Sequence, residues 1–417
     1  MVKWLSSDAT QESIFPFFIA SIFLVIIFWV VTIAVLLKII PLWSFLVVCA
    51  ANALMTVLTI GKTDQLFAKA EGLRSVIESM KKRIEIIQKH SFKSEYLQDI
   101  QAPLIATKNP AIKSLRSIQR LSIMAEFRYS GMIYFLLQLT LLWNVYVYVG
   151  MSHWHRTHRE SHLKSYESLT AFEVLMSTAC FSLENEEFSF PEQIDQSHEI
   201  KFKKLAHPLL SYEQRIENDL SWSNNKPMIL ISGSNMAGKS TFMKALGLNI
   251  MLSRLGAPVC ASMAVFPMMN LKSVINVKDS LAKGDSYLMV ELKRLVSITQ
   301  ANERTNEQGN PIFSLCLFDE IMSGTNSHDR TEIFKAIVMV LKDKNTYAIF
   351  STHDMKLTEY AKTDPQFSLY EFSEQYKEVG DAFFMHFDYK LKEGICNHTN
   401  AQHLLKMLGL DTVEKQE

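Results

Sequence analysis

One segment near the middle of the chain has the residue types and spacing of a phosphate-binding loop, GxxxxGK[ST]. Its members are Gly233, Ser234, Asn235, Met236, Ala237, Gly238, Lys239, Ser240 and Thr241. Backbone N–H groups of such a loop surround phosphate oxygens, and its lysine reaches the β- and γ-phosphates. The hydroxyl that follows the lysine is a ligand of Mg²⁺. The segment therefore predicts a site for ATP and Mg²⁺, with Lys239 as a catalytic contact and Ser240 as a metal ligand.

The neighbours of this loop have the patterns that a phosphate loop requires. An apolar run at 228–232 predicts a strand directly before it. Apolar residues at helical spacing follow until Gly256, and a glycine is typical of a helix end. Strand, loop and helix in this order distinguish a phosphate loop from a chance match. From residue 226 onward, alternating strands and helices favour an α/β nucleotide-binding domain.

Two carboxylates, Asp319 and Glu320, follow a second apolar run at 315–318. If that run is a buried strand, both lie at its carboxyl end, beside the phosphate loop. Asp319 is then placed to hold Mg²⁺ through water, and Glu320 to orient or deprotonate the attacking water. The alternative is that the pair only begins a loop, and the apolar strand before it disfavours this.

A histidine follows a third apolar run, at 347–350. His353 lies in the polar segment 351–354, where a side chain after a strand can contact the γ-phosphate. A lone histidine is more often structural, and that alternative stays open. The position of His353 downstream of Asp319 and Glu320 favours the role of a phosphate sensor.

The N-terminal end of the chain predicts a transmembrane helical hairpin. Residues 14–37 are uncharged and apolar, and so are residues 42–60, with a break at 38–41 between them and Gly61 and Lys62 at the end. A helix of about 20 such residues crosses a hydrocarbon core of about 30 Å. A signal peptide is the alternative, but the first run is too long for one and a second run follows directly.

A third apolar stretch, 131–150, is long enough to span but contains Gln138 and Asn144. Lysine and arginine are enriched on the cytoplasmic side of membranes, and the stretch 62–130 is rich in both. The nucleotide site must also face cytoplasmic ATP. Two spans satisfy both conditions, whereas a third would place the two regions on opposite sides. We therefore predict a multi-pass protein with two spans, and keep a third as the alternative to a buried or membrane-apposed helix at 131–150.

The charged stretch 62–130 also has apolar residues at helical spacing, such as Leu73, Ile77, Ile84 and Ile87. This pattern predicts a lever-like helical region. Its basic residues alternate with acidic ones, which favours a face toward solvent or lipid headgroups over a DNA groove. Lys+Arg and Asp+Glu both number 43, so the total charge gives no argument for nucleic-acid binding.

The cysteines and a group of histidines show no pattern of a disulfide framework or a metal site. The five cysteines are far apart and form no CxxC. The histidines, at His153, His155, His158 and His162, lack a carboxylate or cysteine constellation around them. We expect reduced thiols and no metal at these histidines.

Several segments together resemble the MutS family of mismatch-repair ATPases. The phosphate loop, GSNMAGKST, is similar to the family's GPNMxGKST, and LFDEIMSGTNSHD at 317–329 is similar to LxDExGRGTSTxDG. Further similarities are DSLAKGDSYLMVEL at 279–292 to DDLASGxSTFMxEM, STHD at 351–354 to ATHY, LAHP at 205–208 to RHP, and YKLKEG at 389–394 to YKLxxG. These segments occur in the family's order over roughly 171–411.

The resemblance implies an ABC-like P-loop ATPase domain that dimerises, so that each ATP site is completed in trans. By resemblance, Ser286 lies opposite the γ-phosphate of the ATP held by the partner subunit. Thr325, Asn326 and Ser327 lie at the same interface, and Asn235 helps to fix the nucleotide and the loop.

We therefore expect an α/β fold in three parts: a transmembrane hairpin at 1–61, a helical lever-like region at 62–205 and the ATPase domain at 206–417. The hairpin near residue 14 leaves no length for a mismatch-reading domain and little for connector and clamp domains. Met322 and Ser323 replace the family's Gly-Arg.

The other departures from the family pattern concern the trans interface. Ser286 and Tyr287 replace the family's Ser-Thr, and the sequence HTNA at 398–401 replaces its SYG. We expect the ATP chemistry to be intact.

Two functional hypotheses stay open. The first is a membrane-anchored enzyme that hydrolyses ATP at a dimeric composite site, coupled to DNA in the way that the mismatch-repair family implies. The second is an ATP-gated membrane scaffold or remodelling module without a nucleic-acid ligand. A binding protein without hydrolysis is disfavoured, because the chain has Lys239, Ser240, Asp319, Glu320 and His353. We expect a homodimer through the ATPase domain and a membrane as partners, and the two hypotheses differ in whether DNA is a further partner.

Overall fold

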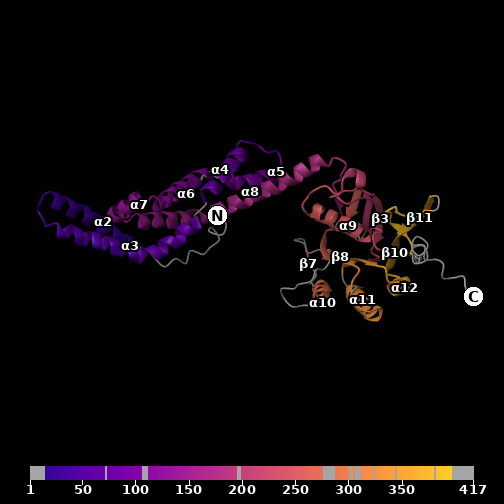
Figure 1. Cartoon of the computed structure of the whole chain (residues 1–417). Helices are drawn as coiled ribbons and strands as arrows, with labels where there is room; N and C mark the ends of the chain where they lie inside the picture. Colours follow the sequence, from indigo (N-terminus) through magenta and orange to yellow (C-terminus); the bar gives the residue numbers. More distant parts are fainter. Residues whose placement is uncertain are drawn as a thin grey trace, which may run out of the picture. The chain divides into compact units, whose positions relative to one another are not determined.

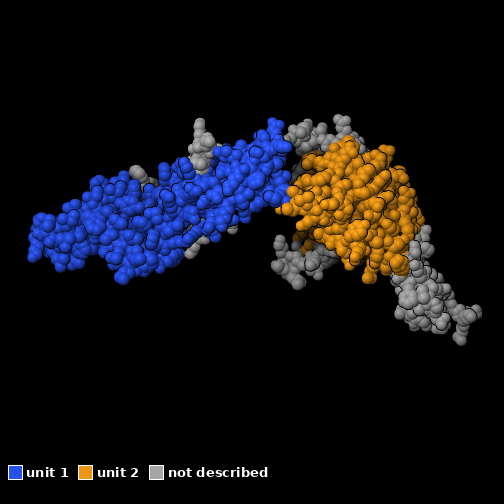
Figure 2. Space-filling view, turned by 90° about the horizontal axis from the view of Figure 1, so that it is seen from above, with its two compact units in different colours: residues 1–176 blue, residues 177–417 orange. Residues whose placement is uncertain are grey.

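The computed structural model of the chain describes residues 15–70, 73–105, 111–194, 199–275, 287–299, 304–305, 311–322, 325–342, 345–379 and 382–396. The chain divides into two compact units, 1–176 and 177–417, which Figure 2 shows in different colours. The domain boundaries after residues 61 and 205 stay predictions.

The first unit begins with two apolar helices that pack against each other, α2 (Phe15–Leu36) and α3 (Trp43–Ala70) (Figure 1). Helix α2 ends where Lys38 takes a φ of 59° and the N–H of Ile39 donates to the Ala34 carbonyl at 2.9 Å. Mean hydropathy reaches 3.0 in α2 and 1.9 in α3. Among the described residues, these two helices are long and apolar enough to cross a membrane, judged by length and composition.

Helix α3 runs beyond the end that the sequence predicts. Gly61 and Lys62, expected to close the second apolar run, lie inside the helix. A single glycine costs a helix only about 1 kcal/mol relative to alanine. The helix continues to Leu66 and Phe67, which are buried in the core of the first unit. The packing of these side chains therefore outweighs the local interruption.

The stretch 131–150 forms two helices rather than the single helix that we expected. Helices α7 (Met132–Leu141) and α8 (Trp143–Glu184) meet at 80°, and Leu142 between them has a φ of 47°. The Gln138 side chain accepts the backbone N–H of Asn144 at 3.1 Å and donates to a threonine hydroxyl of α3 at 3.0 Å. The polar residues of this stretch thus bond at the break. Counting the bent pair as one span would give the described residues up to three.

The rest of the first unit is helical, as the charged stretch predicts. Its elements are α4 (Leu73–Gln88), α5 (Glu95–Ile105), α6 (Ala111–Glu126) and the 3-10 turn η1 (Phe127–Tyr129). Ile77 and Ile84 are fully buried and Ile87 is partly buried in the common core. The helical spacing of these residues therefore predicts the buried face of α4.

The buried histidine of α8 contributes to packing. The Nε2 of His162 lies 2.7 Å from the Ser114 hydroxyl, and its ring stacks on Trp154 with centroids 5.0 Å apart. Burial, helped by the nearby charge of His158, lowers the pKa of His162 to about 4. Within the described ranges no group of three or more His, Cys, Asp or Glu side chains could hold a metal.

The central sheet of the second unit has the strand order β13-β10-β4-β9-β8-β6, with β7 beside β8. Its strands are β4 (Met228–Gly233), β6 (Met269–Val274), β7 (Arg304–Thr305), β8 (Pro311–Asp319), β9 (Thr346–Thr352), β10 (Phe367–Phe372) and β13 (Lys392–Glu393). The predicted strands at 228–232, 315–318 and 347–350 lie in β4, β8 and β9. Strands β10, β4, β9, β8 and β6 run parallel, so their carboxyl ends meet at one edge.

Helices cover both faces of this sheet, with α9 (Lys239–Arg254) on one face and α10 (Tyr287–Thr299), α11 (Ser327–Lys342) and α12 (Met355–Thr363) on the other (Figure 1). Ile229 and Ile231 pack in the core that contains α9, whereas Met228 and Leu230 pack in the core of the other helices. Strand β4 is thus buried on both faces, which explains why its sequence is a continuous apolar run.

A second sheet, of order β1-β5-β2-β3, shares the core of α9. The remaining elements are β1 (Glu192–Gln193), β2 (Glu199–Leu205), β3 (Asn218–Ser223), β5 (Met263–Phe266), the turn η2 (Tyr212–Gln214), and the antiparallel pair β11 (Glu374–Val379) and β12 (Ala382–Phe387). This mixed architecture confirms the α/β prediction.

Candidate nucleotide-binding site

The phosphate loop leaves the carboxyl end of β4 and enters α9, and two glycines make its path sterically allowed. Gly233 has a φ of 145°, and a Cβ there would lie 2.3 Å from the Phe372 carbonyl oxygen of β10. Gly238 has a φ of 112°, and its Cβ would lie 3.1 Å from the Tyr389 ring. Side chains rarely adopt such angles, so both positions require glycine. The loop therefore passes close to its neighbours with bare backbone.

Lys239 is 4% exposed and folds back onto the loop. Its Nζ donates to the carbonyls of Gly233 at 2.7 Å and Ser234 at 2.8 Å. The same atom lies 3.4 Å from Oε1 of Glu320. The ammonium is thus held beside the catalytic carboxylate predicted from the sequence, with protein oxygens around it.

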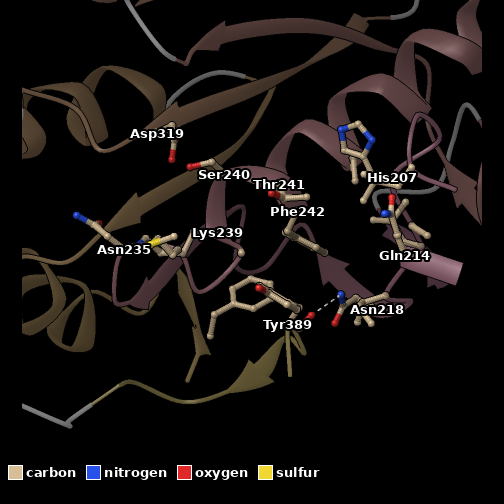
Figure 3. A pocket seen from close by; sticks show the side chains of 18 of the residues that line it. His207, Gln214, Asn218, Asn235, Lys239, Ser240, Thr241, Phe242, Asp319 and Tyr389 are labelled. Atoms are coloured by element: carbon tan, nitrogen blue, oxygen red, sulfur yellow. Dashed lines mark hydrogen bonds between the residues drawn. The ribbon is translucent and has the colours of Figure 1, made fainter. Parts of the chain in front are cut away.

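Asp319 and Ser240 approach each other from β8 and α9. Figure 3 shows their side-chain oxygens directed toward one another. The parallel pairing of β8 with β9 puts Asp319 opposite Ser351, whose hydroxyl donates to Oδ1 of Asp319 at 2.6 Å. A hydroxyl and a carboxylate oxygen are ligands that Mg²⁺ prefers, and the metal usually completes its shell with water and phosphate. The residues present therefore fit Mg²⁺.

Glu320 has a φ of 46°, and its backbone N–H donates to both the carbonyl and the hydroxyl of Ser351, at 3.3 and 3.1 Å. Its Oε1 lies 3.4 Å from Nδ1 of His353, which is 46% exposed. The left-handed backbone costs a non-glycine residue about 1–2 kcal/mol. Ser351 offsets this by anchoring the strained residue to β9, between Lys239 and His353.

A pocket of about 750 Å³ opens beside the loop. It is lined by Leu205, Ala206, His207, Leu210, Gln214, Ile216, Asn218, Ser234, Asn235, Met236, Gly238, Lys239, Ser240, Thr241, Phe242, Ala245, Asp319, Glu320, Phe372 and Tyr389. Figure 3 shows that its lining residues come from chain segments far apart in the sequence, among them those of His207, Lys239, Asp319 and Tyr389. Most of the predicted loop residues therefore face one cavity together with both predicted carboxylates.

The far wall of this pocket was not predicted as part of the site. The amide of Asn218 donates to the Tyr389 carbonyl at 3.1 Å and accepts the Leu391 N–H at 2.7 Å, which fixes the segment that carries the tyrosine. Burial, and then the charge of Lys244, lower the pKa of His207, so this ring is neutral at pH 7. His207 and Tyr389 lie in segments with family resemblance, but sequence spacing gives no signal that they meet.

Ser234 bonds to a buried carboxylate. Its hydroxyl donates to Oε2 of Glu374, at the start of β11, at 2.8 Å, and Glu374 is 7% exposed. Ser234 occupies the position of proline in the resembled loop pattern, so a proline there could not make this bond. No sequence pattern points to Glu374, which is far from the loop along the chain.

The predicted interface residues are partly described. Asn326 caps α11, because its Oδ1 accepts the Asp329 N–H at 2.9 Å. The Ser327 hydroxyl donates to Oδ2 of Asp354 at 3.0 Å. Thr325 donates its N–H to the Met322 carbonyl at 3.1 Å. The proposed trans contact Ser286 lies outside the described residues, as do Ser323 and the segment 398–401.

Comparison with known proteins places this geometry in a family context. The model of MutS domain V matches residues 229–413. The chain is 28% identical to the DNA mismatch repair protein MutS of Thermotoga petrophila over 258 residues, 61% of this chain and 31% of that protein. It is 32% identical to that of Bacillus cereus over 249 residues, 58% of this chain and 26% of the relative. The chain thus spans about a third of the length of the curated relatives it matches.

Proposed function

We propose that this chain binds ATP with Mg²⁺ at the phosphate-loop pocket and hydrolyses it, because residues 229–413 match the model of MutS domain V. One observation carries the proposal. Glu320 lies 3.4 Å from Lys239 Nζ and 3.4 Å from His353 Nδ1, at the edge of the sheet where the phosphate loop begins. A carboxylate with a cation on one side and an imidazole on the other is suited to act at a terminal phosphate.

Phosphate binding requires Lys239 to exchange its partners. Its Nζ leaves the carbonyls of Gly233 and Ser234 and donates to β- and γ-phosphate oxygens. The lysine is already buried, so little further desolvation opposes this exchange. The backbone N–H groups of the loop and of the first turn of α9 then face the phosphates.

Ser240 and Asp319 are the proposed Mg²⁺ residues, the serine directly and the aspartate through water. When bound, Mg²⁺ neutralises charge that develops on the phosphate oxygens. Asp319 keeps its orientation through the hydroxyl of Ser351. Glu320 orients the attacking water or takes its proton, and His353 donates to the γ-phosphate.

The aromatic wall supports a position for the base. Phe242, Phe372 and Tyr389 line the same pocket as the loop, and the neutral His207 stands near them. Pockets of about 300–1,000 Å³ hold ligands of nucleotide size, and aromatic faces stack on bases. We therefore place the adenine on this side of the pocket.

We further propose that the ATPase units dimerise with Ser286 of one subunit at the ATP of the other, and that α2 and α3 anchor the chain in a membrane. Relatives named DNA mismatch repair proteins favour DNA as the coupled ligand. The apolar helices α2 and α3 favour the second candidate, an ATP-gated membrane scaffold without nucleic acid.

ATP binding and turnover by the detergent-solubilised full chain test the proposal. Wild-type protein should hydrolyse ATP in the presence of Mg²⁺, and Lys239→Met should lose at least tenfold in ATP affinity because a phosphate contact disappears. Lys244→Met, five residues farther along the same helix, is the matched control for the loss of a cation. Turnover that Lys239→Met leaves intact would place the chemistry elsewhere.

DNA titrations separate the two candidate roles. Binding to duplex, mismatched or branched DNA should weaken linearly with the logarithm of salt concentration if phosphates are contacted. Absence of binding to all three at low salt would favour the scaffold.

A further inference from the structure

The backbone that follows the proposed catalytic carboxylate is held in an unfavourable conformation. Glu320 and Met322 have φ angles of 46° and 56°, in the left-handed region that side chains disfavour. In the resembled pattern LxDExGRGTSTxDG, glycine stands at the position of Met322, and another glycine stands at the position of Arg330. Glycine adopts positive φ without strain, so this chain has lost the residue that makes the turn easy.

Arg330, in the first turn of α11, bonds to the loop that contains this turn. Its Nε donates to the Met322 carbonyl at 3.2 Å, and its Nη2 donates to the Thr325 carbonyl at 3.0 Å. Its Nη1 pairs with Oδ2 of Asp354 at 3.1 Å, and these two side chains are only 13% and 10% exposed. The planar guanidinium therefore reaches three acceptors at once, which a lysine could not do.

The other side of Met322 is held by Glu291 of α10. Oε1 of Glu291 accepts the Met322 N–H at 2.7 Å, and the glutamate is 1% exposed. Met322 is itself 1% exposed. Both backbone polar groups of Met322 are thus bonded by ionisable side chains from two different helices. Within the described residues, neither Arg330 nor Glu291 lines the nucleotide pocket.

We propose that Arg330 and Glu291 are positioning residues that fix the Met322 backbone and so hold Glu320 in its reactive orientation. Arg330, which stands where the resembled pattern has glycine, replaces by its side-chain bonds the conformational freedom that glycine supplies at the position of Met322, whereas Glu291 matches the glutamate of the resembled pattern. This inference rests on the proposed function, because Glu320 must be the residue that acts on water. As a consequence, these two side chains affect the rate of the hydrolytic step, whereas the phosphate loop determines the affinity for ATP.

Steady-state kinetics of the full chain test the inference. Arg330→Lys keeps a positive charge beside Asp354 but loses the planar guanidinium that bonds three acceptors. Its kcat should fall at least tenfold, which corresponds to about 1.4 kcal/mol of transition-state stabilisation, while its KM for ATP stays within twofold of wild type. Lys335→Met is the matched control, since its cation lies on the same helix but pairs with Glu332 at the surface. The control should keep wild-type kcat.

Two substitutions of Glu291 give an independent arm. Glu291→Leu removes the acceptor and should lower kcat as Arg330→Lys does, whereas Glu291→Gln keeps an acceptor oxygen and should lose less. Thermal unfolding identifies variants that fail to fold. If Arg330→Lys does not fold, the difference in kcat between Glu291→Gln and Glu291→Leu decides the inference. Unchanged kcat in folded Arg330→Lys, or equal kcat in the two Glu291 variants, would overturn the inference. A parallel loss of ATP affinity would overturn it too, by indicating a merely structural role.

The proposed function can fail separately. If the wild-type chain does not hydrolyse ATP, the function proposed above is wrong before either positioning residue is tested.

Discussion

Replacing Gly233 by alanine should destabilise the second unit more than the same replacement at Gly238, the other glycine of the phosphate loop. The new Cβ would lie 2.3 Å from the Phe372 carbonyl oxygen, a backbone atom of a paired strand, and the φ of 145° is strained for alanine. Strain of about 1–3 kcal/mol and a similar cost for displacing β10 give a loss of about 2–6 kcal/mol. At roughly 2–4 °C per kcal/mol, the melting temperature should fall by about 10 °C.

Two other glycines provide matched controls for this substitution. Gly256 has a φ of 73° but a Cβ there meets nothing within 4 Å, so Gly256→Ala should cost only about 1–2 kcal/mol. Gly61 lies within α3 and is also uncrowded, so Gly61→Ala should stabilise the first unit by about 0.5–1 kcal/mol.

Thermal unfolding followed by circular dichroism, together with binding of a fluorescent ATP analogue, provides the assay. Gly233→Ala should lose both stability and ATP affinity, because the displaced strand carries the loop with it. If Gly233→Ala has the same melting temperature as Gly256→Ala and binds the analogue with wild-type affinity, the close approach of β4 and β10 at the loop is wrong.

Three further predictions follow from individual contacts. Ser351→Ala removes the donor to Asp319 and an acceptor of the Glu320 N–H, so kcat should fall about tenfold or more with ATP affinity within threefold; an unchanged kcat would remove Ser351 from the site. Ser234→Ala leaves the buried Glu374 oxygen without its donor and should cost about 1–3 kcal/mol in thermal unfolding, whereas in a Glu374→Gln background the same change should cost less. Burial lowers the pKa of His162 to about 4, against 6.5 in the unfolded chain, so the ring is neutral in the folded protein. Its contribution to the free energy of unfolding is therefore present above pH 6.5 and is lost, by up to about 3 kcal/mol, as the pH falls toward 4. His162→Phe should make the stability depend less on pH in this range, and an equally steep curve in the variant would contradict the prediction.

The sequence predicts those parts of the site that depend on local order along the chain. The phosphate loop, the strand before it and the helix after it are consecutive, so a short pattern and its neighbours identify all three. The carboxylates Asp319 and Glu320, and likewise His353, follow strands whose carboxyl ends must share an edge in a parallel sheet. That topological rule brings distant residues together without any knowledge of the packing.

Contacts that depend on side-chain geometry escape the sequence. Glu374 reaches Ser234, and Arg330 reaches Met322, through the placement of strand ends and helix turns that no spacing rule encodes. Local chemistry also misled the prediction in the first unit. Gly61 and Lys62 interrupt an apolar run without ending α3, because buried residues farther along stabilise the helix.

At Leu142, in contrast to α3, contacts end a helix instead of extending it. Nothing in the composition of 131–150 marks this leucine as a helix end, since leucine favours helices. Bonds from Gln138 to Asn144 and to α3 stabilise the bend. Long-range polar contacts therefore decide where α7 ends.

A single-turnover comparison of wild-type protein with Glu320→Gln tests the central claim most directly. The amide keeps the size and one acceptor oxygen of the side chain but is not a base, so both proteins should bind ATP–Mg²⁺ with affinities within about threefold. Hydrolysis should slow at least a hundredfold in the variant, about 2.7 kcal/mol of lost transition-state stabilisation. Hydrolysis at the wild-type rate by Glu320→Gln would contradict the assignment of this carboxylate, and with it the proposed reaction at this pocket.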